Sequence, residues 1–214
     1  MPIVDGVPEP GWSSLVRPAR PIPREASDIH HITDEMVRDA PERAAVAAIV
    51  SRECGRWPLV LHNAPFDLPF IAALLRAGGC PPLGNPVIDT LGLARGAPDP
   101  DGGAPGLGEH SLGALARRFQ LPIETAHRAA GDARTTARVF AELARLWERG
   151  NAAHSVAELA AESQDVVRRT RRERDAAAGP GLTARRPPET LFPLAGTPPV
   201  NSGAATYGEG PEEP

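Results

Sequence analysis

Short apolar runs alternate with helix-like apolar spacing over the first 150 residues of the chain. The runs at residues 59–61 and 86–90 predict buried strands, and the alternating residues 12–17 predict a half-buried strand. Asp-Gly at positions 5 and 6 is a hairpin signal, so the chain is expected to begin inside a hairpin.

Helices are predicted where apolar residues recur every three or four positions and capping residues stand at the ends. Thr33 is expected to cap a short helical turn. Longer helices are expected from Asp39 and Pro41 onward with Val46, Ile49 and Val50 on one side, from Pro65 to Gly78 with Phe66, Phe70 and Leu74 on one side, after Ser111, over residues 129–147, and over residues 155–178. Strands that alternate with helices indicate an α/β fold.

Proline and glycine divide the chain into parts. Of 214 residues, 25 are Pro and 21 are Gly, too many to lie only in packed elements. Residues 187–214 are rich in both, contain acidic side chains and have no basic one, which predicts a disordered acidic tail. We therefore expect a first domain over residues 1–150, a helical, arginine-rich extension over 151–186 and the tail over 187–214.

Charge and composition exclude several classes of protein. The formal net charge is -4, and all 23 basic side chains are arginines, so any phosphate contact uses a guanidinium, which can bind bidentately. No apolar run approaches the ~20 residues of a membrane span, and no apolar signal core follows Met1. Cys54 and Cys80 form no C-x-x-C pair, which predicts free thiols. We expect a cytoplasmic protein without membrane association.

Three side chains stand where a sheet could bring chemistry together. Asp67 follows a predicted strand at the start of a helix, and His127 and Asp132 stand at the entrance to another helix. Carboxylates suit two divalent cations ~4 Å apart, and a histidine can take a proton from the attacking water. Taken singly, each Asp could equally cap a helix, and His127 could be a surface histidine.

The residues around these side chains narrow the choice. Residues 59–70 read Leu-Val-Leu-His-Asn-Ala-Pro-Phe-Asp-Leu-Pro-Phe, and residues 127–133 read His-Arg-Ala-Ala-Gly-Asp-Ala. They resemble the second and third motifs of the DEDDh family of 3′-5′ exonucleases, which includes the proofreading epsilon subunits of bacterial DNA polymerase III. Residues 87–90 and 110–112 are similar to the family's spacers, and residues 15–18, 21–23 and 29–36 to its strand and loop, with His31 in place of the common Gly. The resemblance covers roughly residues 3–147 and rests on several ordered motifs.

The resemblance implies a ribonuclease H-like fold, a mixed sheet flanked by helices, two Mg²⁺ or Mn²⁺ ions, and removal of nucleotides from single-stranded DNA 3′ ends in proofreading or repair. By position, Asp67 and Asp132 match the family's metal-binding aspartates, and His127 matches its general base. Glu25 and His30 match positions that contact the terminal nucleotide, His62 and Asn63 are expected to shape the site, and Asp89 is expected to cap the helix that follows it.

The family's first motif, Asp-x-Glu on its first strand, has no counterpart here. Asp5 and Glu9 are the only acids before Trp12, and their spacing across a turn does not present both carboxylates to one metal pair. The resemblance therefore implies that the N-terminal strands of the fold are missing. Two functions stay open: a metal-dependent 3′-5′ exonuclease impaired in this chain, and a non-catalytic nucleic-acid-binding or polymerase-associated module.

Two further segments carry hypotheses. Five arginines lie between Arg168 and Arg174, and they are either a solvated helix face or a surface that follows phosphates. Residues 191–194, Leu-Phe-Pro-Leu, are an apolar cluster in the tail that could dock on a polymerase or sliding clamp, or pack back on the domain.

Overall fold

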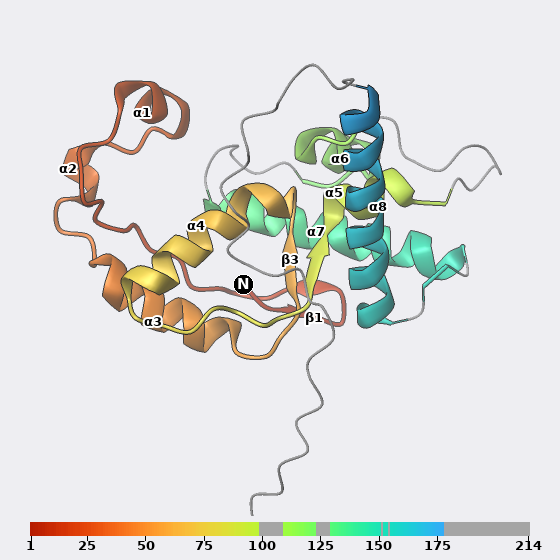
Figure 1. Cartoon of the computed structure of the whole chain (residues 1–214), viewed down its shortest axis with the longest axis horizontal. Coiled ribbons are helices and arrows are strands. Elements are labelled where there is room, and N and C mark those ends of the chain that lie inside the picture. Colours follow the sequence, from red (N-terminus) through yellow and green to blue (C-terminus); the bar gives the residue numbers. More distant parts are fainter. Residues whose placement is uncertain (99–108, 123–128, 151, 154, 178–214) are drawn as a thin grey trace, which may run out of the picture. The chain divides into compact units, whose positions relative to one another are not determined.

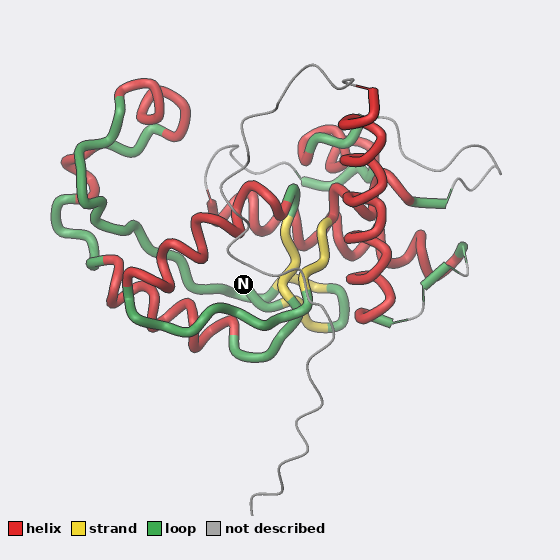
Figure 2. Tube along the Cα trace, in the orientation of Figure 1, coloured by secondary structure: helices red, strands yellow, loops and turns green. Residues whose placement is uncertain are grey.

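Figures 1 and 2 show the arrangement of helices and strands in a computed structural model of the chain. The structure describes residues 1–98, 109–122, 129–150, 152–153 and 155–177, and every structural statement below refers to these residues. They lie within one compact unit, Met1–Leu182. The domain boundaries at residues 150 and 186 stay predictions, and the apolar cluster at residues 191–194 lies outside the described residues.

Helices outnumber strands among the described elements, and both kinds occur in alternation, which confirms the α/β class. In chain order they are β1 (Ile3–Val4), β2 (Val7–Pro8), α1 (Arg24–His30), α2 (Asp34–Val37), α3 (Arg43–Cys54), β3 (Leu59–Leu61), α4 (Ala64–Ala77), β4 (Val87–Asp89), α5 (Thr90–Gly96), α6 (Leu112–Arg118), α7 (Ala129–Arg149) and α8 (Val156–Ala177). No described helix has both the length and the apolar composition that crossing a membrane requires.

The described strands form two separate two-stranded sheets, one of which is the predicted hairpin at Asp5 and Gly6. β1 and β2 form the expected antiparallel hairpin, in which Asp5 and Gly6 both have positive φ angles, of 51° and 77°. Positive φ at both central residues is the geometry for which Asp-Gly is selected in tight hairpins. β3 and β4 are parallel, with Leu61 opposite Asp89, so their carboxyl ends meet at one edge.

The core lies where α5, α6, α7 and α8 pack around β4. Its fully buried side chains include Ile88, Leu93, Leu115, Val139 and Leu143. Trp147 of α7 is 4% exposed and donates a hydrogen bond from Nε1 to the carbonyl oxygen of Leu93, at 3.1 Å. Because a buried indole N–H without a partner would be costly, this bond fixes how α7 meets α5.

Helix α8 satisfies the edge of β4 that no strand covers. Ser163 Oγ accepts a hydrogen bond from the Asp89 amide at 3.1 Å, and Gln164 Nε2 donates to the Val87 carbonyl at 3.0 Å. Gly92 permits this approach, because a Cβ at that position would lie 2.3 Å from the Ser163 carbonyl oxygen. Two side chains of a helix thus replace part of the strand ladder that β4 lacks on this side.

The predicted strand at residues 12–17 is wrong. This segment pairs with other backbone only through an isolated bridge between Arg17 and Glu42. A strand is stable when its amides and carbonyls find a neighbouring strand, and no described strand runs beside these residues. Alternation of side chains alone does not supply that partner.

Two predicted helix details also need correction. The helix expected from Asp39 and Pro41 begins only at Arg43, and its N-cap residue makes no side-chain capping bond. In α4, Phe66 and Phe70, predicted to line an apolar face, are 65% and 67% exposed, whereas Ala72 and Leu75 are buried. The rings of Phe66 and Phe70 pack on each other, with 5.6 Å between their centroids. They stay exposed because helix α3, which packs against α4, covers another side of it. The run at residues 59–61, expected to be fully buried, is half-buried.

We expect Gly92→Ala to lower the free energy of unfolding. A new Cβ would meet backbone of Ser163, which cannot swing aside, so crowding costs the upper end of the usual range, about 3 kcal/mol. The better helix propensity of alanine returns about 1 kcal/mol, so the net loss is about 2 kcal/mol. Urea unfolding of the variant measures this loss. Gly84→Ala is the control, because nothing lies within 4 Å of a Cβ built there. Equal stabilities of the two variants would show that α5 and α8 do not depend on this close approach.

Candidate functional site

The candidate site lies at the shared carboxyl ends of β3 and β4 (Figure 1). His62 and Asn63 follow β3 directly, and Asp89 is the last residue of β4. Asp67 stands in the first turn of α4, the helix that begins after Asn63. Parallel strands place the residues that follow them at one edge of the sheet, which is where α/β proteins gather their functional side chains.

Asp89 joins the two strand-to-helix turns. Its Oδ1 accepts hydrogen bonds from the Asn63 amide and the Leu91 amide, both at 2.9 Å, and its Oδ2 accepts one from the Ala64 amide at 3.1 Å. The residue is 2% exposed. One carboxylate therefore caps α5, as predicted, and also holds the first turn of α4, which the sequence did not reveal.

The turn between β3 and α4 has a defined backbone geometry. Asn63 adopts the left-handed conformation, with φ 64° and ψ 53°. Asparagine tolerates this conformation better than most residues, and Pro65 has a fixed φ angle that suits the start of a helix. The chain therefore turns sharply after His62, and Asp67 is brought to the end of the sheet.

The surroundings of Asp67 disfavour the ionised form of its carboxyl group. Burial, and then the negative charge of Asp89, raise the pKa of the Asp67 carboxyl above its ordinary value. Two carboxylates close to the same sheet end favour occupation by a cation, because a cation would relieve both effects.

His62 is held in one tautomer. Its Nδ1 lies 2.9 Å from the Thr90 hydroxyl oxygen, and that hydroxyl donates its proton to the Leu61 carbonyl at 3.2 Å. The hydroxyl must then accept from His62, so Nδ1 carries the proton and Nε2 is left with its lone pair. Burial lowers the pKa of His62, which favours the neutral ring at neutral pH.

The structure brings some predicted site residues together and leaves others apart. Asp132 lies in the first turn of α7 and is half-buried. His127 lies outside the described residues, so its role stays a prediction. Within the described ranges, no group of three or more His, Cys, Asp and Glu side chains could hold a metal ion. Asp67 and Asp132 have the right donor atoms for Mg²⁺ or Mn²⁺, but the described residues do not complete a site for these ions.

The two residues predicted to contact a terminal nucleotide lie on α1. Glu25 is exposed in its first turn, and His30 ends the helix with its Nδ1 accepting from the Ile32 amide at 3.0 Å. In the part of the chain that is described, no hydrogen bond or ion pair joins Glu25 or His30 to Asp67 or His62. Their contact with substrate stays a prediction.

Sequence reasoning missed Thr90 and Ser163, which orient His62 and Asp89. Thr90 is fully buried, and its place directly after the strand-ending aspartate was a signal that could have been used. Ser163 lies 74 positions from Asp89, and only packing of α8 against β4 brings them together. His110, beside this region, has a pKa that burial lowers and a buried Nε2 without a partner among the described atoms.

Comparison with known proteins relates this chain to exonucleases and DNA polymerase III proteins. The family model described as Exonuclease, RNase_T, matches residues 3–140. The chain is 38% identical over 131 residues to DNA polymerase III subunit epsilon of Treponema pallidum, covering 60% of this chain and 58% of that protein. It is 35% identical over 129 residues to DNA polymerase III PolC-type of Streptococcus sanguinis, covering 60% of this chain and 8% of that one.

Among solved structures, exonuclease X in complex with 5′ overhanging duplex DNA is similar, with a TM-score of 0.53 and 26% identity, covering 76% of this chain and 86% of that chain. These matches confirm the ribonuclease H-like exonuclease fold that the motifs imply. The chain spans about three fifths of the treponemal protein and a much smaller share of the PolC-type protein.

Asp89→Ala is expected to lower the free energy of unfolding by about 3 kcal/mol or more, because three amides in or beside buried backbone lose a charged acceptor. Asp89→Asn is expected to cost about half as much, since its amide oxygen can still accept while its NH₂ faces the Ala64 amide. Urea unfolding gives these values, and hydrogen exchange at Asn63 and Ala64 locates the change. Asp28→Ala, which removes an exposed carboxylate at 4.0 Å from Arg24, is the control and should cost under ~0.5 kcal/mol. A loss no larger than the control's would contradict the capping role.

His62 makes the stability depend on pH. Because folding lowers its pKa below the ordinary value of 6.5, the unfolded chain binds more protons near that pH, and the free energy of unfolding falls as pH decreases through 6.5. The His62→Asn side chain can still donate to Thr90 but does not titrate. In this variant the loss of stability between pH 7.5 and 5.5, measured by thermal unfolding, should be smaller than in the wild type. His31→Asn changes an exposed histidine and is the matched control. The prediction is wrong if both variants follow the wild-type curve.

Proposed function

Because the chain belongs to the RNase_T exonuclease family, we propose that its site is that of a 3′-5′ exonuclease of the DEDDh class acting on DNA. One observation supports this most strongly. The range of the family match, residues 3–140, includes the turn that presents His62, Asn63 and Asp67 at the carboxyl end of the sheet, and Asp132 in α7. Both aspartates of the motifs lie inside the range that the family model matches, which supports their proposed role.

The proposed roles follow the motifs. Asp67 and Asp132 would hold Mg²⁺ or Mn²⁺ through carboxylate oxygens, and His127 would take the proton of the attacking water. Such ions, when bound, supply charge neutralisation at the scissile phosphate. His62 and Asn63 shape the turn that carries Asp67, and Asp89 holds that turn by its backbone, so we do not include these three among the reacting groups.

DNA is the substrate class that the comparisons favour. The treponemal and streptococcal relatives are DNA polymerase III proteins, and the similar exonuclease X structure is a complex with duplex DNA. We propose a single-stranded 3′ end as the substrate, with Glu25 and His30 at the terminal nucleotide. A DNA polymerase or sliding clamp is a proposed partner, and the cytoplasm the proposed compartment.

We propose that hydrolysis by this 214-residue chain is impaired. No Asp-x-Glu occurs anywhere in its sequence, and the described residues do not complete a site for a metal ion. A non-catalytic module that binds nucleic acid or a polymerase is the second candidate, and the same absence favours it.

The test measures release of 3′-terminal nucleotides from labelled single-stranded DNA with Mg²⁺ and with Mn²⁺. The 214-residue chain is expected to show little or no release, because loss of two carboxylates weakens metal binding and misaligns the water. A fusion that places an Asp-x-Glu strand ahead of Met1 is expected to gain activity. In that fusion, Asp132→Asn and His127→Gln should each lower the rate at least ~10²-fold.

Asp67→Asn in the fusion separates a functional from a structural role. It is expected to abolish release and to leave the protein at least as stable at pH 7, because the ionised Asp67 in its buried, negatively charged surroundings opposes folding. Thermal unfolding without metal checks the second part. Robust release by the 214-residue chain would contradict the impairment. A fusion that folds and binds DNA yet never cleaves it would favour the non-catalytic module.

A further inference from the structure

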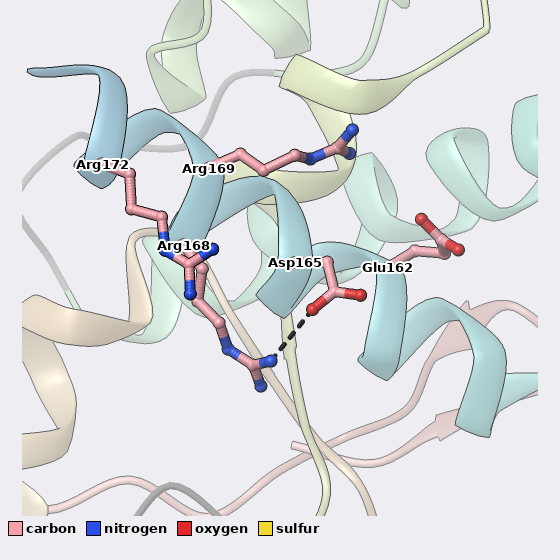
Figure 3. A pocket seen from close by; sticks show the side chains of 5 residues that line it. All are labelled: Glu162, Asp165, Arg168, Arg169 and Arg172. Atoms are coloured by element: carbon pink, nitrogen blue, oxygen red, sulfur yellow. Dashed lines mark hydrogen bonds and ion pairs between the residues drawn. The ribbon is translucent and has the colours of Figure 1, made fainter.

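Helix α8 has two faces of different character. Its buried residues, Leu159, Ala160, Ser163 and Val166, pack against α5 and β4. At 3.6 residues per turn, the side chains at 162, 165, 168, 169 and 172 fall within about 120° of one another on the opposite side. They are Glu162, Asp165, Arg168, Arg169 and Arg172, which line one surface depression (Figure 3). We name Arg168, Arg169 and Arg172 the arginine face.

The arginine face is only partly neutralised. Arg168 Nη1 lies 3.0 Å from Asp165 Oδ1, and both side chains are about half exposed, so this pair stabilises the fold by at most ~1 kcal/mol. Arg169 and Arg172 are exposed and have no ion-pair partner among the described residues. A face that served only to solubilise the helix would gain little from keeping two guanidiniums unpaired on adjacent turns.

The position of the arginine face relates it to the candidate site. Ser163 lies on the buried face of α8, and its hydroxyl oxygen accepts a hydrogen bond from the Asp89 amide at the end of β4. Helix α8 runs in the same general direction as β4 (Figure 1), and Val166 lies against Gly96 at the end of α5, the helix that follows β4. Residues of α8 after Val166 therefore lie beyond the carboxyl end of the sheet. With a rise of 1.5 Å per residue, Arg168 and Arg172 lie about 8 and 14 Å farther along the helix axis than Ser163.

We propose that the arginine face binds backbone phosphates of a DNA strand whose end is held at the candidate site, an inference that rests on the proposed function. Because these axial displacements from Ser163 exceed the rise of one nucleotide, a strand must extend past the candidate site by more than a dinucleotide to reach the arginine face. Guanidiniums bind phosphate oxygens bidentately and without reading bases. The arginine face therefore adds affinity for longer strands, whatever their sequence.

The principal test is DNA binding by the whole 214-residue chain. The variant Arg168→Gln, Arg169→Gln, Arg172→Gln is titrated against a fluorescein-labelled single-stranded 20-mer in EDTA, where no hydrolysis occurs. Fluorescence anisotropy is expected to show at least ~10-fold weaker binding at low salt, and a log K versus log salt slope that is smaller by about 2, as three lost contacts to single-stranded DNA predict. Two different sequences should be affected equally.

The control has the same change in charge. Arg52→Gln, Arg56→Gln, Arg76→Gln removes three exposed arginines of α3, α4 and the loop after α3. If this control weakens binding as much as the arginine-face variant does, the attraction depends on net charge alone and the proposal is overturned. Asp165→Asn provides a gain-of-function check, because it releases Arg168 from its carboxylate and should tighten binding about two-fold.

Strand length and cleavage separate this proposal from the function on which it rests. A dinucleotide should bind the wild type and the arginine-face variant alike, since it cannot reach α8. If 20-mer binding is unchanged in the variant while Asp67→Asn abolishes cleavage by the fusion protein, the arginine face is wrong and the exonuclease stands. If the variant loses binding but no form of the protein cleaves DNA, the arginine face stands and the exonuclease fails. Unchanged thermal unfolding of the variant shows that the exposed substitutions left the fold intact.

Discussion

The candidate site depends on the hydrogen bonds that the Asp89 carboxylate accepts from backbone amides. This carboxylate is buried at the end of β4 and accepts three amide hydrogen bonds, two from the start of α4 and one from the start of α5. Those amides have no partner within their own helices, because a helix leaves its first N–H groups free. A left-handed Asn63 costs ~1 kcal/mol or more, and the bonds from Asp89 offset that cost. Both helices therefore start where one side chain allows them to start.

The neighbours of Asp89 transmit this constraint outward. Its own amide donates to Ser163, which ties the end of β4 to α8, and Gly92 leaves room for the two helices α5 and α8 to meet. Thr90, the next residue, holds His62 by its ring and Leu61 by its carbonyl. A short parallel pair of strands is thereby held by side chains from two helices, α5 and α8. Among the described residues this pair positions Asp67 without the wider sheet that usually supports such a site.

The burial that holds the site in place also disfavours the ionised Asp67 side chain when no ligand is bound. Burial of Asp67, and then the negative charge of nearby Asp89, raise the pKa of its carboxyl. His62 is kept neutral with its Nε2 lone pair available. Groups in this condition are characteristic of sites that bind or react, because the fold sacrifices some stability to keep them in place. On the opposite side of α8, Arg168, Arg169 and Arg172 line one surface depression, and the proposed DNA contact would use their charge.

The sequence by itself determined the local elements and the candidate chemistry. Asp5-Gly6 specifies its hairpin, Thr33 caps its helical turn, and the motif around Asp67 indicates both a strand-to-helix turn and an exonuclease family. These are signals between residues that are close in the chain, where backbone preference and capping act directly. Tertiary structure alone decided which edges are covered and which faces are buried. Residues 12–17 have a strand-like pattern and no strand beside them, and Phe66 and Phe70 have core-like spacing and lie exposed, because the burial of a side chain depends on what packs against it. The bond between Asp89 and Ser163 joins residues 74 positions apart, and no local pattern encodes a contact that only the packing of α8 against β4 creates.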